Sequence, residues 1–143
     1  MTRRRVVAAH ILRLEGVLLL TVAGIHLAVI PELRSVLVRN LDRASFSFAW
    51  PPFLLNHVVV GILLIPIGVS TIFCASGVRA GERWAWRVGM SYAIAVLTLP
   101  AALVAIMDRH YFTALPFLTA AILVGAVGIS MAWPLIWVRR ELS

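Results

Sequence analysis

Long stretches without Asp, Glu, Arg or Lys constrain the fold of this chain more than any other feature. The longest of them runs from Ala44 to Val78. Hydrophobic residues make up 62% of the 143 residues and charged residues only 13%, whereas soluble domains carry about 25% charged residues. So few charges cannot cover a water-soluble globule. The composition therefore predicts an all-α membrane protein whose main solvent is lipid.

Four stretches are long enough to cross a bilayer. A transmembrane helix needs about 20 mostly apolar residues, because the hydrocarbon core is about 30 Å thick and each residue rises about 1.5 Å. The pair Pro51-Pro52 favours the start of the second helix and Gly77 its end, while Pro66 and Pro100 are expected to bend the second and third helices. We expect one integral membrane domain over residues 1–143, a four-transmembrane-helix bundle with helices at about 6–30, 52–75, 84–107 and 115–138.

The distribution of arginine indicates how these helices are oriented. All 13 basic residues are arginines, and with 6 acidic residues the net charge is +7. The side that holds both termini has Arg3, Arg4, Arg5, Arg13, Arg79, Arg83, Arg87, Arg139 and Arg140, and the other side has Arg34, Arg39, Arg43 and Arg109. The positive-inside rule then places both termini in the cytoplasm, in what we expect to be a bacterial plasma membrane. Because the arginines flank apolar runs and do not form one stripe, we interpret them as anchors at lipid headgroups and not as a nucleic-acid surface.

The segment after the first helix is predicted to form a short amphipathic helix on the outer surface of the membrane. Between Pro31 and Arg43, one helical face collects the apolar residues Leu33, Val36, Leu37 and Leu41. Pro31 suits the first turn of such a helix. The aromatic residues that follow, Phe46, Phe48 and Trp50, are expected to form a belt at the headgroup level.

Small residues repeat along the fourth predicted helix. Their spacing places on one face Ala121, Gly125, Gly128 and Ala132. Helices in lipid associate through such faces, because small side chains let two backbones approach closely. Two interpretations stay open, namely packing within the chain and association with a partner membrane subunit or a second copy. The lipid bilayer is the other expected partner.

Polar residues are expected to meet at the outer end of the bundle. In the predicted topology this end holds Glu32, with His26 and Asn56-His57 about one turn inside it and Asp108-Arg109-His110 at the end of the third helix. Ionisable groups within transmembrane segments are rare and often functional. His26, His57 and His110 together with Asp108 have the donor atoms to bind a transition metal such as copper, zinc or iron.

Other chemistry is open to the same residues. His26 and His57 from facing helices could be the two axial ligands of a b-type haem, in which case they are cofactor-binding residues. Asp108 or Glu32 could act as a general base on a lipid-like substrate such as a sterol or quinone. The structural alternative is that the histidines only form hydrogen bonds with water or headgroups and that Asp108 and Arg109 belong to a solvated loop.

The turn before the third predicted helix reads Gly81-Glu82-Arg83-Trp84-Ala85-Trp86-Arg87. Trp and Arg at such a position anchor a helix at the membrane interface. The Gly-x-Arg-Trp-Ala-Trp string, the chain length and the helix number resemble small four-helix integral membrane proteins of the DoxX-like kind. The resemblance covers the layout of the chain and assigns no functional residue. It implies a four-helix fold and an accessory, redox-linked role like that of some members.

Three functions are therefore expected from the sequence, in order of preference. The first is an accessory or structural subunit of a membrane assembly, because the chain is small and shows no soluble catalytic domain. The second is a membrane redox protein that binds a metal or haem, and the third is a small membrane enzyme acting on a lipid-like substrate. A dithiol redox centre is excluded, because Cys74 is the single cysteine.

Overall fold

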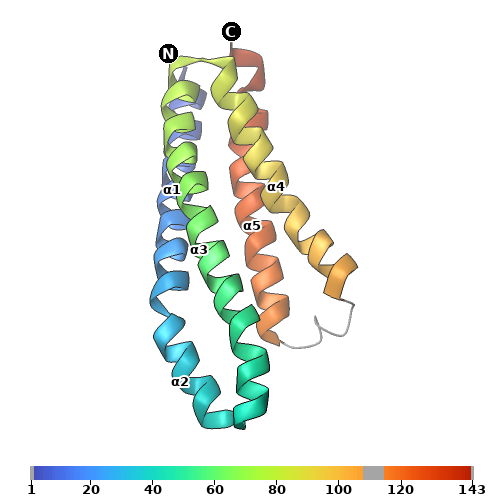
Figure 1. The fold of residues 1–143 in the computed structure, drawn as a ribbon. Coiled ribbons are helices and arrows are strands. Elements are labelled where there is room, and N and C mark those ends of the chain that lie inside the picture. The colour runs from blue at the N-terminus through green and yellow to red at the C-terminus, as the bar shows by residue number, and fades with distance from the viewer. Residues whose placement is uncertain (1, 108–114, 143) are drawn as a thin grey trace. The chain divides into compact units, whose positions relative to one another are not determined.

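Every regular element in the described part of the chain is helical. A computed structural model describes residues 2–107 and 115–142. The elements are α1 (Arg3–Ala28), α2 (Ile30–Asn40), α3 (Arg43–Ala80), α4 (Arg83–Met107), α5 (Leu115–Val138) and the 3-10 turn η2 (Arg139–Glu141) (Figure 1). The all-helical class predicted from the sequence is confirmed for these residues.

Three of the described helical segments are long and apolar enough to cross a membrane. They are Arg3–Ala28, Arg43–Ala80 and Leu118–Glu141. Helix α4 has 25 residues but is not among them. Its first two turns contain Arg83 and Arg87, and the stretch from Val88 to Met107 carries no Asp, Glu, Arg or Lys. The three segments are consistent with a membrane location.

Helix α3 begins at Arg43, nine residues (52 − 43) before the start that the proline pair suggested. It has 38 residues, and Pro51, Pro52 and Pro66 all lie inside it, so the predicted start at residue 52 is wrong. The backbone N–H of Ser45 donates to Oδ1 of Asp42 at 2.9 Å, and the Ser45 hydroxyl donates to Oδ2 at 2.9 Å. Asp42 therefore caps the helix, and these hydrogen bonds hold the pKa of its carboxyl below the usual value. A cap that satisfies free N–H groups starts the helix here, while the prolines ten residues later only remove two internal donors.

Helix α3 ends at Ala80 and not at Gly77. Gly81 has a φ of +94°, which glycine adopts without a steric penalty. Its N–H donates to the carbonyl of Val78 at 3.1 Å, and the N–H of Glu82 donates to the carbonyl of Gly77 at 2.9 Å. This is the Schellman pattern of a helix C-terminus, so Gly81 and not Gly77 is the terminating glycine.

The predicted helix after the first span is present as α2. Pro31 lies in its first turn, and none of its residues is buried. Leu41 ends it in an extended conformation, with its N–H donating to the carbonyl of Leu37 at 2.9 Å. The aromatic residues expected at the headgroup level lie in the first turns of α3, where the rings of Phe46 and Trp50 stack with their centroids 6.0 Å apart.

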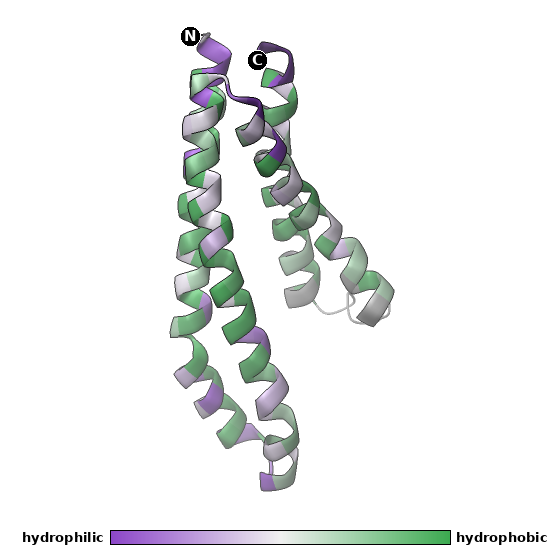
Figure 2. Cartoon of the chain, turned by 45° about the horizontal axis from the view of Figure 1, so that its top comes forward, coloured by the Kyte–Doolittle hydropathy of each residue, from purple (hydrophilic) through white to green (hydrophobic). Residues whose placement is uncertain are grey.

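The chain forms two compact units, which are described separately. Unit 1 consists of residues 1–15 and 70–143, and unit 2 of residues 16–69. The core of unit 1 brings together segments that are distant in the sequence. Its fully buried side chains include Leu12 from α1, Val78 from α3, Ala85 from α4 and Leu135 from α5. Hydrophilic residues of unit 1 gather in the first turn of α1, the α3–α4 turn and the C-terminal segment (Figure 2).

Unit 2 packs the second half of α1 against the first part of α3. A Cβ added at Gly68 would lie 2.9 Å from the carbonyl oxygen of Gly16, and one added at Gly61 would lie 2.8 Å from the Leu27 side chain. The two backbones therefore approach as closely as glycine allows. The absence of side chains at Gly61 and Gly68 lets the two helices of this unit pack closely. Leu19 and Ala23 of α1 are also buried.

Candidate functional site

Two of the four histidines lie side by side in unit 2. The ring centroids of His26 on α1 and His57 on α3 are 5.5 Å apart, and the rings are tilted by 37°. Both side chains are partly buried. The predicted proximity of these two candidate ligands is therefore present in the structure.

Each ring is held by a backbone carbonyl of its own helix. Nδ1 of His26 lies 3.1 Å from the carbonyl oxygen of Val22, and Nδ1 of His57 lies 3.0 Å from that of Phe53. A carbonyl oxygen only accepts hydrogen bonds, so Nδ1 carries the proton in both rings and donates. In a neutral ring the lone pair is then on Nε2. Metal-binding histidines are commonly oriented by such a hydrogen bond from the other ring nitrogen.

The spacing of the rings favours one kind of ligand over another. A metal–nitrogen bond of ~2.0 Å plus ~1.1 Å from the nitrogen to the ring centre places each ring centroid ~3.1 Å from a bound metal ion. Two such rings have their centroids ~6.2 Å apart when the two bonds are in line and ~5.1 Å apart when the bonds meet at a tetrahedral angle. The observed 5.5 Å lies closer to the bent arrangement. A haem with histidines on its two faces requires the in-line arrangement. The pair as it stands fits two ligands of one metal ion better than a haem.

The structure describes only some of the other predicted site residues. Asp108, Arg109 and His110 lie outside the described residues. Oε1 of Glu32 accepts from Nη2 of Arg39 at 3.4 Å, and both side chains are largely exposed. Asn56 is exposed. Within residues 2–107 and 115–142, no group of three His, Cys, Asp or Glu side chains could hold a metal ion.

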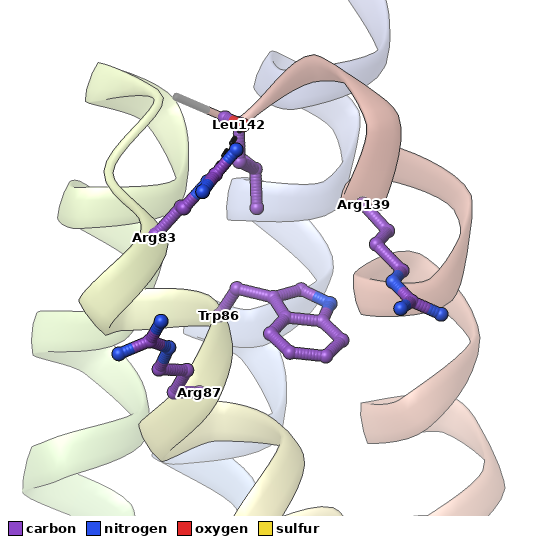
Figure 3. A pocket seen from close by; sticks show the side chains of 5 residues that line it. All are labelled: Arg83, Trp86, Arg87, Arg139 and Leu142. Carbon is purple, nitrogen blue, oxygen red and sulfur yellow. Dashed lines mark hydrogen bonds between the residues drawn. The ribbon is translucent and has the colours of Figure 1, made fainter.

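Unit 1 holds a basic cavity that sequence reasoning did not identify. It has a volume of about 310 Å³ and is lined by Arg83, Trp86, Arg87, Arg139 and Leu142. Figure 3 shows Arg83 and Arg87 coming from the first turns of α4 and Arg139 from η2. Arg83 and Arg139 are 56 positions apart (139 − 83), so no local pattern could indicate that they line one cavity. The only signal in the sequence was the clustering of arginines next to Trp86.

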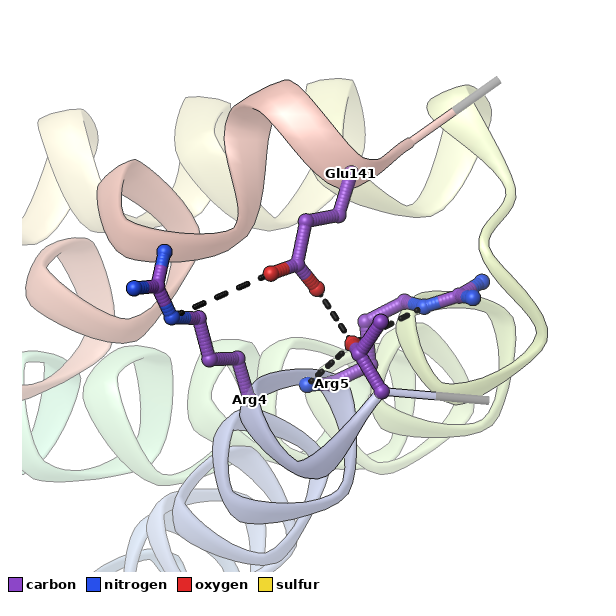
Figure 4. A network of polar contacts seen from close by, with 4 residues as sticks. Arg4, Arg5 and Glu141 are labelled. Carbon is purple, nitrogen blue, oxygen red and sulfur yellow. Dashed lines mark hydrogen bonds and ion pairs between the residues drawn. The ribbon is translucent and has the colours of Figure 1, made fainter.

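A polar network joins the two terminal segments of unit 1. Nε of Arg4 lies 3.9 Å from Oε1 of Glu141, whose other oxygen accepts from the Thr2 hydroxyl (Figure 4). Nη1 of Arg5 donates to the carbonyl oxygen of Ala80 at 3.4 Å. These contacts place the N-terminus, the C-terminal segment and the end of α3 at one end of the unit.

One carboxylate in α1 lacks a complete set of partners. Oε2 of Glu15 is buried and has no hydrogen-bond partner in the described part of the chain. A buried polar atom without a partner is costly, so such an atom often marks a functional position. Its signal in the sequence was a single acidic residue between apolar neighbours. Nothing else in the described residues identifies a ligand for it.

The small-residue face of α5 is used along only part of its length. A Cβ at Gly128 would lie 2.7 Å from Cγ of Leu97, and Ala132 is buried, so this half packs within unit 1. At Gly125 a Cβ would meet nothing within 4 Å, and Ala121 is only partly buried. Packing within the chain is therefore shown for the half with Gly128 and Ala132, and association with a partner stays a prediction.

Comparisons with known proteins do not place the chain in a family. No family model, no curated protein and no solved structure matches it.

Proposed function

We propose that this chain is an integral membrane protein with four spans and serves as an accessory subunit of a larger membrane assembly. The observation that carries the proposal is the exposure of large apolar side chains on the helices. Leu14 is 71% exposed, Phe73 66% and Trp133 67%. A surface of this kind is stable in lipid or against another apolar surface, and not in water.

The arrangement of unit 1 supports an even number of crossings with both termini in the cytoplasm. The network around Glu141 and Arg5 joins the N-terminus, the C-terminal segment and the end of α3 at one end. All nine arginines assigned to the cytoplasmic side belong to this unit, since they fall within residues 1–15 and 70–143. With α1, α3 and α5 as spans, α4 as the fourth span returns the chain to the starting side.

The accessory role is supported by the part of the α5 face that the described residues of unit 1 leave open. Around Gly125 the face offers backbone access to another helix. The DoxX-like layout expected from the sequence points in the same direction, because some proteins of that kind resemble accessory subunits. The partner is proposed to be an apolar helix of another membrane subunit.

Site-specific photo-crosslinking in intact membranes tests this role. A photoreactive phenylalanine analogue at Gly125 is expected to give a discrete crosslinked protein band. The same analogue at Leu123, which is 60% exposed and lies two residues away, is the matched control and is expected to give none. Equal crosslinking at both positions, or a purified lone chain with its own catalytic turnover, would contradict the accessory role.

A second candidate function is metal binding by the histidine pair. It is favoured by the 5.5 Å ring spacing together with the two free Nε2 lone pairs. The protein supplies two neutral nitrogen ligands, which suit zinc, copper or iron, and the other ligands have to come from other residues or water.

Elemental analysis and absorption spectroscopy of the detergent-purified protein test metal binding. We expect a stoichiometric transition metal in the native chain, lost in His26→Ala and in His57→Ala. His10→Ala is the matched control and should keep the metal, because His10 is an exposed histidine of unit 1. A metal-free native protein of normal stability would remove this candidate, and a Soret band would favour haem over a single ion.

A further inference from the structure

The basic cavity of unit 1 has no role in either function above. Arg83, Trp86 and Arg87 reach it from the start of α4, Arg139 from η2 and Leu142 from the residue after η2. Its volume of about 310 Å³ corresponds to the space of ~10 water molecules, at ~30 Å³ each. That is enough for a phosphate group and the first atoms esterified to it.

The charge in this cavity is not compensated by nearby carboxylates. Among residues 2–107 and 115–142, no carboxylate oxygen lies within ion-pair distance of Arg83, Arg87 or Arg139. The acidic residues next to these arginines are engaged elsewhere. Glu82 accepts from the indole N–H of Trp84, and Glu141 contacts Arg4 and Thr2. The N-terminus of α4 adds partial positive charge at the same place.

The geometry of the arginines suits a multivalent anion. Nε of Arg83 donates to the carbonyl oxygen of Leu142 at 3.4 Å, which leaves its terminal nitrogens available. The guanidinium carbon of Arg139 lies 5.5 Å from the centroid of the Trp86 ring, which holds that side chain beside the cavity. The Arg87 side chain forms no hydrogen bond or ion pair with another side chain of the described residues. Arginine presents a planar set of donors that matches the oxygens of a phosphate.

Part of the wall is apolar and fixed. The indole N–H of Trp86 donates to the carbonyl oxygen of Leu135 at 3.0 Å, which sets the orientation of the ring. Leu142 is buried beside it. A ligand whose charged group is attached to apolar chains can place the charge at the arginines and the first apolar atoms against Trp86 and Leu142. Free inorganic anions make no use of such a wall.

We propose that this cavity binds a phosphate group, and specifically the headgroup phosphate of an anionic phospholipid in the cytoplasmic leaflet. Basic pockets next to transmembrane helices on the cytoplasmic side are suited to such headgroups. The inference rests on the membrane location and orientation given under Proposed function, but not on the accessory role. A soluble phosphate ester shares the same recognition chemistry, so the experiment has to separate these two sources.

Binding is tested on the full chain in detergent micelles by titrating phosphatidylglycerol, phosphatidylcholine, glycerol 3-phosphate and inorganic phosphate. The readouts are native mass spectrometry for bound lipid and the shift of the thermal unfolding midpoint. We expect phosphatidylglycerol to bind and to stabilise the protein, and phosphatidylcholine to do so at least ~10-fold more weakly, because its positive choline group faces the arginines.

Matched charge variants distinguish this site from general attraction to a basic protein. The cavity variant carries Arg83→Gln, Arg87→Gln and Arg139→Gln, and the control carries Arg3→Gln, Arg79→Gln and Arg140→Gln. Each lowers the net charge from +7 to +4 (7 − 3), and all six positions belong to unit 1. The cavity variant should lose phosphatidylglycerol binding at least ~10-fold and the control less than ~2-fold.

The outcomes separate the sources and can overturn the proposal. Loss confined to the cavity variant, with phosphatidylglycerol preferred to both soluble phosphates, supports the lipid site. Equal stabilisation by glycerol 3-phosphate, lost in the same variant, overturns the lipid source and keeps the phosphate site. Equal losses in both variants, or equal binding of phosphatidylcholine, overturn the site altogether. If the cavity variant does not fold, Arg87→Gln alone should reduce the binding, because the Arg87 side chain forms no hydrogen bond or ion pair within the described residues whose loss could unfold the protein.

Discussion

The two units of this chain are stabilised in different ways. In unit 1, hydrogen bonds join residues far apart in the sequence, such as Thr2 with Glu141 and Trp86 with Leu135. In unit 2, hydrogen bonds such as those of His26 with Val22 and of Asn40 with Val36 stay within about one turn of the same helix. There the helices are brought together by close backbone approach at glycine. Long-range hydrogen bonds thus supplement apolar packing in unit 1, and close backbone approach at glycine joins the helices of unit 2.

This difference has a consequence for where function can reside. A long-range polar network fixes side chains from several elements in one place, which is what a binding cavity requires. Close glycine packing fixes two backbones and allows side chains at the edge, such as the histidine pair, to meet. The cavity and the histidine pair are thus products of the two modes of packing.

The largest effect is expected from truncating the core of unit 1. Leu135→Ala removes a fully buried side chain and should lower the free energy of unfolding by ~2–5 kcal/mol, because it leaves a cavity among packed helices. Ile136→Ala is the matched control, since Ile136 is 59% exposed, and should change stability little. Detergent-induced unfolding followed by circular dichroism measures both. Similar losses for the two variants would show that the core is not the main support of unit 1.

A smaller effect, with opposite signs at two glycines, is expected in unit 2. Gly68→Ala should destabilise by ~1–3 kcal/mol, because the new Cβ would lie 2.9 Å from a backbone oxygen of α1 that cannot move away easily. Gly24→Ala meets nothing within 4 Å and should stabilise its helix by up to ~1 kcal/mol.

Thermal unfolding of both glycine variants in the same detergent measures these changes. If both variants changed stability in the same direction, backbone contact at position 68 would not be the factor that determines the stability of unit 2. A gain in stability at both positions would mean that α1 and α3 separate without cost.

The smallest effect concerns the cap between α2 and α3. The pKa of Asp42 is lowered in the folded state by its hydrogen bonds to Ser45. Its contribution is therefore present above the unfolded pKa near 3.8 and is lost as the pH falls through the lower, folded pKa. Protection factors for hydrogen exchange at residues 43–46, which account for the intrinsic pH dependence of amide exchange, should fall in that acidic range.

Two substitutions separate the charge of this cap from its hydrogen bonds. Asp42→Ala should show low protection factors at residues 43–46 at every pH, because it removes the carboxylate oxygens that accept from Ser45. Asp42→Asn keeps one acceptor oxygen but has no carboxylate to protonate. Its protection factors at residues 43–46 should therefore stay high as the pH falls. Unchanged exchange in Asp42→Ala would mean that this cap does not determine where α3 begins.

Sequence patterns predicted those features of the fold that are determined within a single helix. The apolar runs located the helices, the stretch after Pro31 indicated α2, and the last helix begins and ends as expected at 115 and 138. The start of α3 was missed because a proline pair is a conspicuous local signal, whereas a cap depends on one carboxylate meeting one N–H. Gly77 was preferred to Gly81 because φ is not visible in a sequence.

The candidate sites divide in the same way. His26 and His57 could be predicted as neighbours, because the predicted topology placed both about one turn inside the outer ends of consecutive membrane helices. The basic cavity could not, since Arg139 and Leu142 reach α4 only through tertiary packing. Asp108 and His110, proposed with the histidines, lie outside the described residues, so their membership in that site stays a prediction.

The turn at Gly81 also bears on how the protein is made. Only Gly81 and Glu82 separate α3 from α4, and at about 3.3–3.6 Å per residue such a connection has no slack. In the proposed topology the two helices must then enter the bilayer as a hairpin, soon after the second has left the ribosome. Any change that inverts one of them during synthesis must invert the other, so the pair is the unit whose insertion determines the final orientation.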